Sequence, residues 1–304
     1  MGKTLLILMA GFAISFGILA QSKNQRYLDA VDRMVKQVSE YSEKNAASSG
    51  VHKALNQLYL DPSWRGSYNN LAIAGGTANI NVVDDSAGSA PKAHQVKIRS
   101  TSGSTLTEVV VFDTGFHEFA VWAKDTVIHV ITRDSANVLD NNLLMQKAPY
   151  MPRIDYDGLY SAAMTQGHLE NEDFLGHFHP SPNFPNSQFY YDSSAVSVVP
   201  NVIHVDGDLH VREDYIVYGI FIVEGDVLLD ENARVRGVLY LPNAASKIYN
   251  NDNDDSRVTG GIVTWGKIDG KNDYIIVRHR PEYLRALVGN YAPNNPPIRV
   301  LTWK

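Results

Sequence analysis

The sequence contains no cysteine, so disulfides, thiolate metal ligands and cysteine nucleophiles are excluded. It also has no surplus of positive charge, because the 304-residue chain carries a formal net charge of −6. An RNP motif, a zinc-finger pattern, a P-loop, a Gly-x-Gly-x-x-Gly motif and a Gly-x-Ser-x-Gly motif are all missing. We therefore expect no nucleic-acid partner and no bound cofactor.

Proline is absent before Pro62, so nothing between Met1 and Leu60 forbids a long helix. The run from Leu5 to Ala20 is apolar, with Ser15 as its one clearly polar residue. A cleaved secretory signal and a retained membrane helix both have this pattern. We expect the segment to be retained.

The residues that follow the apolar run are amphipathic. Leu28, Val31, Val35 and Val38 are spaced three and four apart among charged residues, which predicts one apolar stripe on a helix. The Asp61-Pro62 pair supplies a stop, because a residue before proline disfavours helix. We therefore predict one nearly continuous helix within residues 1–60, interrupted at most around 48–50.

After residue 60 the sequence consists of short runs of strand-forming residues separated by turn residues. Region 61–138 contains alternating or β-branched runs joined by short Asp, Ser and Gly turns, which predict an antiparallel sheet. This sheet is expected to pack on the second half of the helix. Region 139–200 is rich in proline and is expected to be an irregular connection with one short helix at 156–166.

The most specific signal is an internal repeat in region 201–304. The stretch 202–209 recurs as 220–227, and a longer offset further along coincides with a polar insertion at 250–255. A fixed period of this kind predicts a β-helix of roughly four coils, with Gly219, Gly237 and Gly261 at equivalent corners. A run of β-hairpins is the alternative. The predicted fold class is α+β: a long N-terminal helix, an antiparallel region, a C-terminal β-helix and a tail.

Three groups of polar residues are candidates for chemistry. His168, His177 and His179 share one loop, and 250–255 offers oxygen ligands, but neither has a recognised metal-ligand spacing. Asp208 and Asp226 fall one coil apart and are expected to face solvent or cap turns, although paired carboxylates can cleave glycosidic bonds. We predict no catalytic, cofactor-binding or metal-ligating residues, and no enzyme activity.

The order of these features resembles a known family. The apolar and amphipathic helix, the stretches 49–58 and 61–66, the repeated 205–208 and 223–226, and the ends 281–285 and 301–304 look like PilX-type pilus-assembly proteins, which are type IV pilin-like subunits. That family has a Gly-Phe processing site before its apolar run and a glutamate soon after it. Here Gly2 precedes Lys3, Gly11-Phe12 lies inside the run, and the first acidic residue is Asp29.

The resemblance implies a structural subunit of a cell-surface, extracellular filament that assembles with itself or with related pilin subunits and is inserted in the inner membrane beforehand. The residues it assigns to the filament core are Leu5, Leu6, Ile7, Leu8, Phe12, Ile14, Phe16, Ile18, Leu19, Leu28, Val31, Val35 and Val38. The alternative is an exported or membrane-anchored β-helix protein that binds or cleaves polysaccharide. The amphipathic stretch distinguishes the two, since a secreted β-helix has no need of it.

Overall fold

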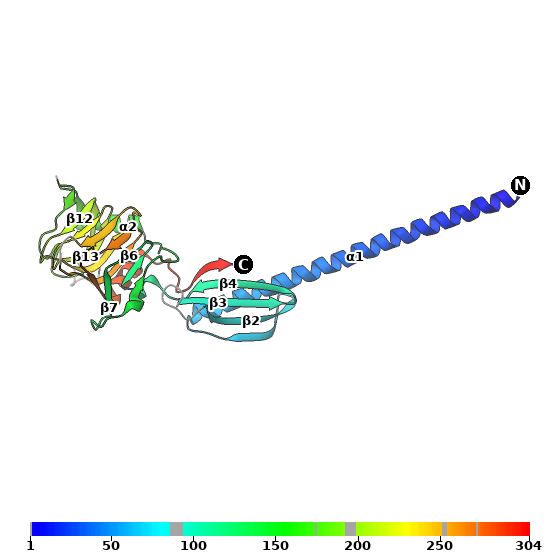
Figure 1. Ribbon diagram of the computed structural model, residues 1–304, viewed down its shortest axis with the longest axis horizontal. Coiled ribbons are helices and arrows are strands. Elements are labelled where there is room, and N and C mark those ends of the chain that lie inside the picture. The colour runs from blue at the N-terminus through cyan, green and yellow to red at the C-terminus, as the bar shows by residue number, and fades with distance from the viewer. Residues whose placement is uncertain (1, 86–93, 174, 192–198, 251–253, 272) are drawn as a thin grey trace.

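The molecule is elongated and consists of a rod-like helix, a small sheet that holds the end of this helix, and a β-solenoid (Figure 1). The computed structural model describes residues 2–85, 94–173, 175–191, 199–250, 254–271 and 273–304. All structural statements below concern these residues.

Helix α1 (Gly2–Leu60) is continuous over 59 residues, which corresponds to about 90 Å at 1.5 Å per residue. The predicted long helix is therefore confirmed, and the Ser48-Ser49-Gly50 stretch does not interrupt it. Its two ends differ in environment. Side chains from Leu5 to Tyr41 are exposed, whereas Val51, Ala54 and Leu58 are fully buried.

The buried end of α1 packs against an antiparallel sheet, as predicted. Its strands are β1 (Ser67–Ile73), β2 (Gly76–Asp84), β3 (Gln95–Ser102), β4 (Thr105–Phe112) and β20 (Arg299–Trp303), in the order β1-β2-β3-β4-β20. The last strand comes from the end of the chain and pairs with β4, placing Arg299 opposite Phe112. The solenoid is consequently inserted between two neighbouring strands of one sheet.

The solenoid is built from parallel strands in two sheets. Its main strands are β9 (Leu169–Asn171), β10 (His177–Phe178), β11 (Val202–Asp206), β12 (Asp208–Val211), β13 (Ile216–Val223), β14 (Val227–Leu229), β15 (Arg234–Leu241), β16 (Lys247–Asn250), β17 (Ser256–Thr264), β18 (Lys267–Asp269) and β19 (Ile275–His279). With β6 (Val127–Ile128) and β7 (Val130–Arg133) included, one sheet follows the order β7-β19-β17-β15-β13-β11-β9 and the other β10-β12-β14-β16-β18-β6. The first of these sheets has seven strands in order, so the solenoid has about seven coils and not the four predicted.

The additional coils come from segments that the sequence pattern did not assign to the solenoid. Strands β5 (Val121–Ala123), β6 (Val127–Ile128) and β7 (Val130–Arg133) pair in parallel with β17, β18 and β19, and β8 (Leu144–Met145) pairs with β5. Strands β9 and β10 extend the opposite end of the stack. Before the solenoid, the strands of the antiparallel sheet thus end at Phe112, and solenoid strands occur on both sides of 138/139 and of 200/201. These strands are too short to carry a periodic pattern.

The repeated glycines align in neighbouring coils with one correction. Gly219 pairs with Gly237, and Gly237 pairs with Gly260, whereas Gly261 lies opposite Val238. They lie within strands and not at strand ends, with φ of 132°, 155° and 143°. Because two glycines are adjacent at 260–261, the alignment of Gly237 with Gly261 expected from the sequence was wrong by one position.

Two hydrophobic cores support the solenoid. The first fills its interior and includes Val217, Phe221 and Leu239. The second lies outside the larger sheet, where α2 (Tyr156–Gln166) and α3 (Pro281–Tyr291) contribute Leu159 and Leu284. The structure confirms the short helix predicted at 156–166. Two 3-10 turns, η2 (Phe116–Glu118) and η3 (Asn141–Leu143), complete the described elements.

Candidate functional site

The first candidate site is the apolar segment of α1, defined as residues 5–20. Its large apolar side chains surround the helix, and the single chain leaves them open to solvent; Phe12 is 59% exposed and Ile14 is 63% exposed. The predicted core residues placed on this segment are Leu5, Leu6, Ile7, Leu8, Phe12, Ile14, Phe16, Ile18 and Leu19. In length and composition, this helix is able to cross a membrane, and a signal sequence has the same property.

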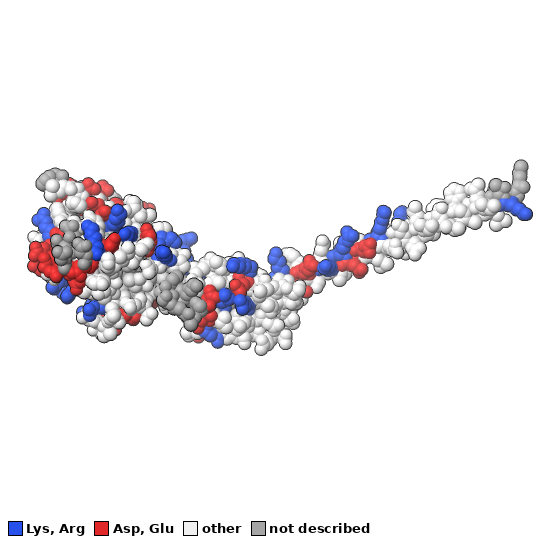
Figure 2. Space-filling model, viewed as in Figure 1, with Lys and Arg blue, Asp and Glu red and all other residues white. Residues whose placement is uncertain are grey.

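The second candidate site is a stripe on the charged middle part of α1, which Figure 2 shows as a band of blue and red next to the white apolar segment. Leu28, Val31, Val35 and Val38 are all exposed there. The sequence pattern missed three further exposed side chains, namely Tyr27, Met34 and Tyr41.

With these residues added, the stripe follows a spacing of four and three residues at positions 27, 31, 34, 38 and 41. This spacing is typical of helices that pack lengthwise against other helices. The signal was present in the sequence, but it appears only when aromatic and Met positions are counted with the aliphatic ones. No part of the described chain covers the stripe.

The residues that dock α1 on its own sheet were also missed. Ala46, Ala47, Val51, Ala54 and Leu58 are fully buried, and their spacing places them on one face of the helix. At Gly50 a Cβ atom would overlap the Ser100 hydroxyl and approach Cγ1 of Ile80 to 3.1 Å. A run of small residues therefore lets the helix approach β2 and β3 closely.

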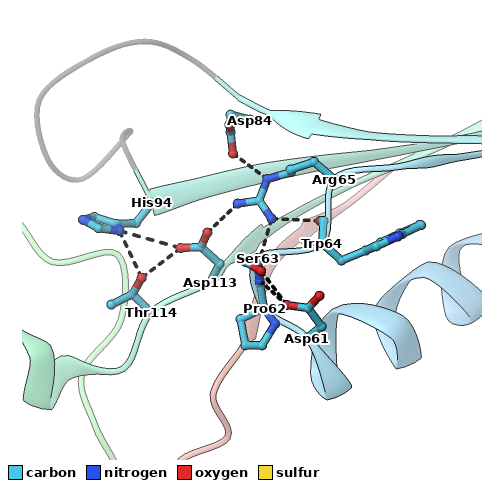
Figure 3. A network of polar contacts seen from close by, with 9 residues as sticks. All are labelled: Asp61, Pro62, Ser63, Trp64, Arg65, Asp84, His94, Asp113 and Thr114. Atoms are coloured by element: carbon cyan, nitrogen blue, oxygen red, sulfur yellow. Dashed lines mark hydrogen bonds and ion pairs between the residues drawn. The ribbon is translucent and has the colours of Figure 1, made fainter.

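A polar network fixes the turn between α1 and the sheet (Figure 3). Nε of Arg65 donates to Oδ1 of Asp84 at 2.6 Å, and Nη2 donates to Oδ2 of Asp113 at 2.6 Å. Nη1 donates to the carbonyl oxygens of Pro62 and Trp64, both at 2.9 Å. One guanidinium thus joins the end of the helix to the ends of β2 and β4.

The same network continues from Asp113 to two neighbours. The Thr114 hydroxyl lies 2.9 Å from Oδ1 of Asp113 and 3.0 Å from Nδ1 of His94. Burial alone would raise the pKa of Asp113, but hydrogen bonds from His94, Thr114 and Arg65 lower it. Asp113 is therefore held as a carboxylate at the point where the chain leaves the sheet.

Of the three histidines singled out in the sequence, His177 and His179 lie close together and His168 does not join them. His177 and His179 are joined by His210, with ring centroids 5.7 Å and 4.6 Å from that residue, whereas His168 packs against Phe184. Burial and the neighbouring His210 lower the pKa of His179. Among the described residues, no group of three or more His, Asp or Glu side chains is arranged to hold a metal ion.

The other candidates also have structural roles or cannot be followed. Oδ1 of Asp208 accepts a hydrogen bond from the Asp226 amide at 2.6 Å, and Oδ1 of Asp226 accepts one from the Lys247 amide at 2.7 Å. Each aspartate therefore caps the backbone of the next coil, as expected. In the polar insertion, Nδ2 of Asn250 donates to the Asp254 carbonyl at 2.7 Å, and 251–253 lie outside the described residues.

Comparisons with protein-family models, with curated proteins and with solved structures found no match for this chain.

Proposed function

We propose that the chain is a structural, non-enzymatic subunit of a type IV pilus-like filament, held together by its N-terminal helices. The observation that carries this proposal is the contrast along α1. One face of its last third is buried against the chain's own sheet, while the apolar segment and the stripe have no cover within the described chain. A helix of this kind requires partners along its length.

The free energy of burying these side chains shows how strongly the helix requires partners. The large side chains assigned to the filament core within the apolar segment are all more than half exposed. At about 1.5–3 kcal/mol for each side chain removed from water, burial of the set is favoured by well over ~10 kcal/mol. Lipid supplies this burial before assembly, and copies of the same helix supply it in a filament. We place the subunit in the inner membrane first and at the cell surface afterwards.

The remainder of the fold is consistent with this role. The antiparallel sheet packs against the C-terminal end of α1, and the solenoid lies at the opposite end of the molecule from the apolar segment (Figure 1). Packing the helices into a bundle therefore leaves the solenoid on the outside, where it is available to surface ligands or for adhesion. The proposed partners are further copies of this chain or related pilin subunits.

The alternative proposal, a membrane-anchored β-helix protein that binds or cleaves polysaccharide, makes a different demand on α1. An anchor needs the apolar segment alone, because a tether to lipid makes no use of an exposed stripe at 27–41. The length and patterning of α1 beyond the apolar segment therefore favour the filament.

The test substitutes Ile14 by Asp within the apolar segment. An unpaired charge inside a helix bundle costs several kcal/mol, and a filament repeats this cost in every subunit. We expect Ile14→Asp to abolish filaments while the β-sheet circular dichroism signal of the body is unchanged. Ile14→Leu is the matched control and should form filaments normally, since it preserves volume and polarity.

Filaments would be counted by negative-stain electron microscopy of surface preparations. To separate failed insertion from failed assembly, Val31→Asp provides a second variant outside the apolar segment. It should insert in the membrane at the level of the unsubstituted chain and still reduce filament number. Normal filament numbers from both aspartate variants would rule out a core built from α1.

A further inference from the structure

One face of the solenoid carries a groove that the proposed function does not use. It lies on the outer side of β7, β15, β17 and β19 and has a volume of about 310 Å³. Five arginines line it: Arg133, Arg234, Arg236, Arg257 and Arg278. The remaining lining side chains are Asn137, Asp255, Thr259 and Ile276. We call this surface the arginine groove.

The parallel register of the coils creates the groove. Arg234 and Arg257 are direct neighbours on adjacent coils and form one column. The neighbouring column contains, in four successive coils, Arg236, Thr259, Arg278 and Arg133. Strands in a sheet are about 4.8 Å apart, so positive charges recur at intervals of one or two such steps. The result is two adjacent columns of guanidinium groups along the solenoid axis.

Within the described residues, these guanidinium groups form no close ion pair with a carboxylate. In the described part of the chain, the arginines that form ion pairs are Arg65, Arg99, Arg280 and Arg285, all outside the groove. The groove arginines instead contact neutral oxygens. Arg133 donates to the Asn137 carbonyl at 3.1 Å, and Arg236 donates to the Tyr218 hydroxyl at 3.3 Å. Among the described lining residues, five positive charges therefore accompany one carboxylate, that of Asp255.

The carboxylate of Asp255 also interacts with a second acidic residue, Asp273. Asp255 lies beside Asp273, and the burial of Asp255 together with the hydrogen bond from that second carboxylic group raises its pKa. Asp255 also interacts with Arg257, which opposes this rise. A single carboxylate whose pKa is raised in this way cannot neutralise two columns of arginine.

A row of arginines is suited to a ligand with regularly spaced anionic groups. The planar guanidinium binds carboxylates, sulfates and phosphates through paired hydrogen bonds. An oligouronate carries a carboxylate on every sugar residue, so its anionic groups recur regularly along an extended chain. The groove offers such a chain a guanidinium group every one or two coils.

The composition of the groove argues against nucleic acid. Single-stranded DNA and RNA are held by aromatic platforms on which bases stack, and no aromatic side chain of the described residues lines the groove. A duplex requires a broad basic surface, whereas the whole chain has a net charge of −6. We propose that the arginine groove binds an acidic polysaccharide, with Arg236 and Arg257 contacting its carboxylates. This inference is independent of filament assembly, because all its residues lie in the solenoid.

The experiment uses the full chain in a non-ionic detergent and a fluorescently labelled oligogalacturonate as the probe. The test variant is Arg236→Gln/Arg257→Gln, which removes two exposed charges from the groove. The matched control is Lys247→Gln/Lys271→Gln, which removes two exposed charges from another surface of the same solenoid, the one that includes Asp226 and Tyr249. Circular dichroism checks that both variants retain the β-sheet signal.

We expect fluorescence anisotropy to show saturable binding, a Kd that rises on the order of 10-fold in the arginine variant, and no change in the lysine variant. The methyl-esterified oligomer, which lacks the charges, should not bind. Four results would overturn the proposal: no binding to the folded chain, equal loss in both variants, equal binding of the ester, or tighter arginine-dependent binding of a single-stranded DNA oligonucleotide. Filament counts do not enter this test, so its failure is distinguishable from failure of the proposed function.

Discussion

The ladder formed by Gly219, Gly237 and Gly260 allows a quantitative test of the solenoid. In this register each glycine stacks directly on the backbone of the preceding coil. A Cβ atom placed on Gly237 would overlap the carbonyl group of Gly219, and φ at this position is 155°. Gly237→Ala therefore faces both an unfavourable backbone conformation and a steric overlap with main chain.

Both costs have known magnitudes. A non-glycine residue held in a sparsely populated backbone region costs about 1–3 kcal/mol. Relieving the overlap requires a backbone shift in a packed core, which costs about 1–3 kcal/mol more. The neighbour is backbone that is hydrogen-bonded in the sheet, so it cannot rotate away as a side chain would. We expect Gly237→Ala to lower the free energy of unfolding by about 2–6 kcal/mol.

The matched control is Gly289→Ala on α3, where a Cβ atom would meet nothing within 4 Å. An exposed helical glycine is less favourable than alanine by about 0.5–1 kcal/mol, so this change should stabilise slightly. Urea unfolding of the full chain in detergent, followed by the β-sheet circular dichroism signal, measures both variants. If Gly237→Ala unfolds at the same urea concentration as the unsubstituted chain while Gly289→Ala shifts upward, the stacked register is wrong.

Two further predictions concern ionisable groups. Because Asp113 has a lowered pKa in the folded chain, its contribution to stability is present above the unfolded pKa and disappears as the pH falls through the folded one. Arg65→Gln should therefore cost about 1–3 kcal/mol in urea unfolding at neutral pH and progressively less in acid; an equal cost at every pH would contradict a charged network. In the arginine groove, Asp255 is a negative charge among the described lining residues, so Asp255→Asn should bind oligogalacturonate more tightly than the unsubstituted chain above the raised pKa of Asp255 and equally tightly below it. Unchanged pH dependence in that variant would exclude Asp255 as the titrating group.

The parts of the fold that were predictable are those encoded within short stretches of sequence. Helix α1 follows from the absence of proline before Pro62 and from the Asp61-Pro62 stop. The solenoid follows from the recurrence of 202–209 as 220–227, which stacks Gly219 on Gly237 directly. These signals depend on neighbours in sequence or on a constant period.

The parts that escaped prediction depend on pairing between distant segments. Strands β5 to β8 join the end of the solenoid, although most of the other coils lie between β5 and β17 along the chain. Strand β20 completes a sheet that begins at Ser67, and a short run at the end of a chain does not reveal its partner. Short parallel strands have little periodicity, so their membership is decided by the coil next to them.

The apolar segment and the arginine groove differ in the same way in how far the sequence predicts them. The apolar segment was predictable, because composition alone defines it. The arginine groove was not, because Arg278 and Arg133 become neighbours only through the pairing of β19 with β7. The arginines at 234 and 257 could have been aligned from the repeat, since each precedes a ladder glycine at the same distance along its strand. The ambiguity at Gly260-Gly261 hid that alignment.

The insertion of the solenoid between β4 and β20 bears on how the proposed filament would carry load. The chain leaves the sheet after Phe112 and returns at Arg299, and these two residues lie opposite each other. Phe112 packs on Trp122 and Tyr150, and the Arg299 guanidinium lies 4.5 Å from the centre of the Tyr150 ring. A force applied to the solenoid thus enters the sheet through two adjacent strands and one shared aromatic contact. Since Asp113 at the same exit is bonded to Arg65, the force continues into the turn that ends α1. In this topology, the body that would meet a surface ligand and the helix that would hold the filament are joined through two adjacent strands and through the contacts of Asp113 and Tyr150.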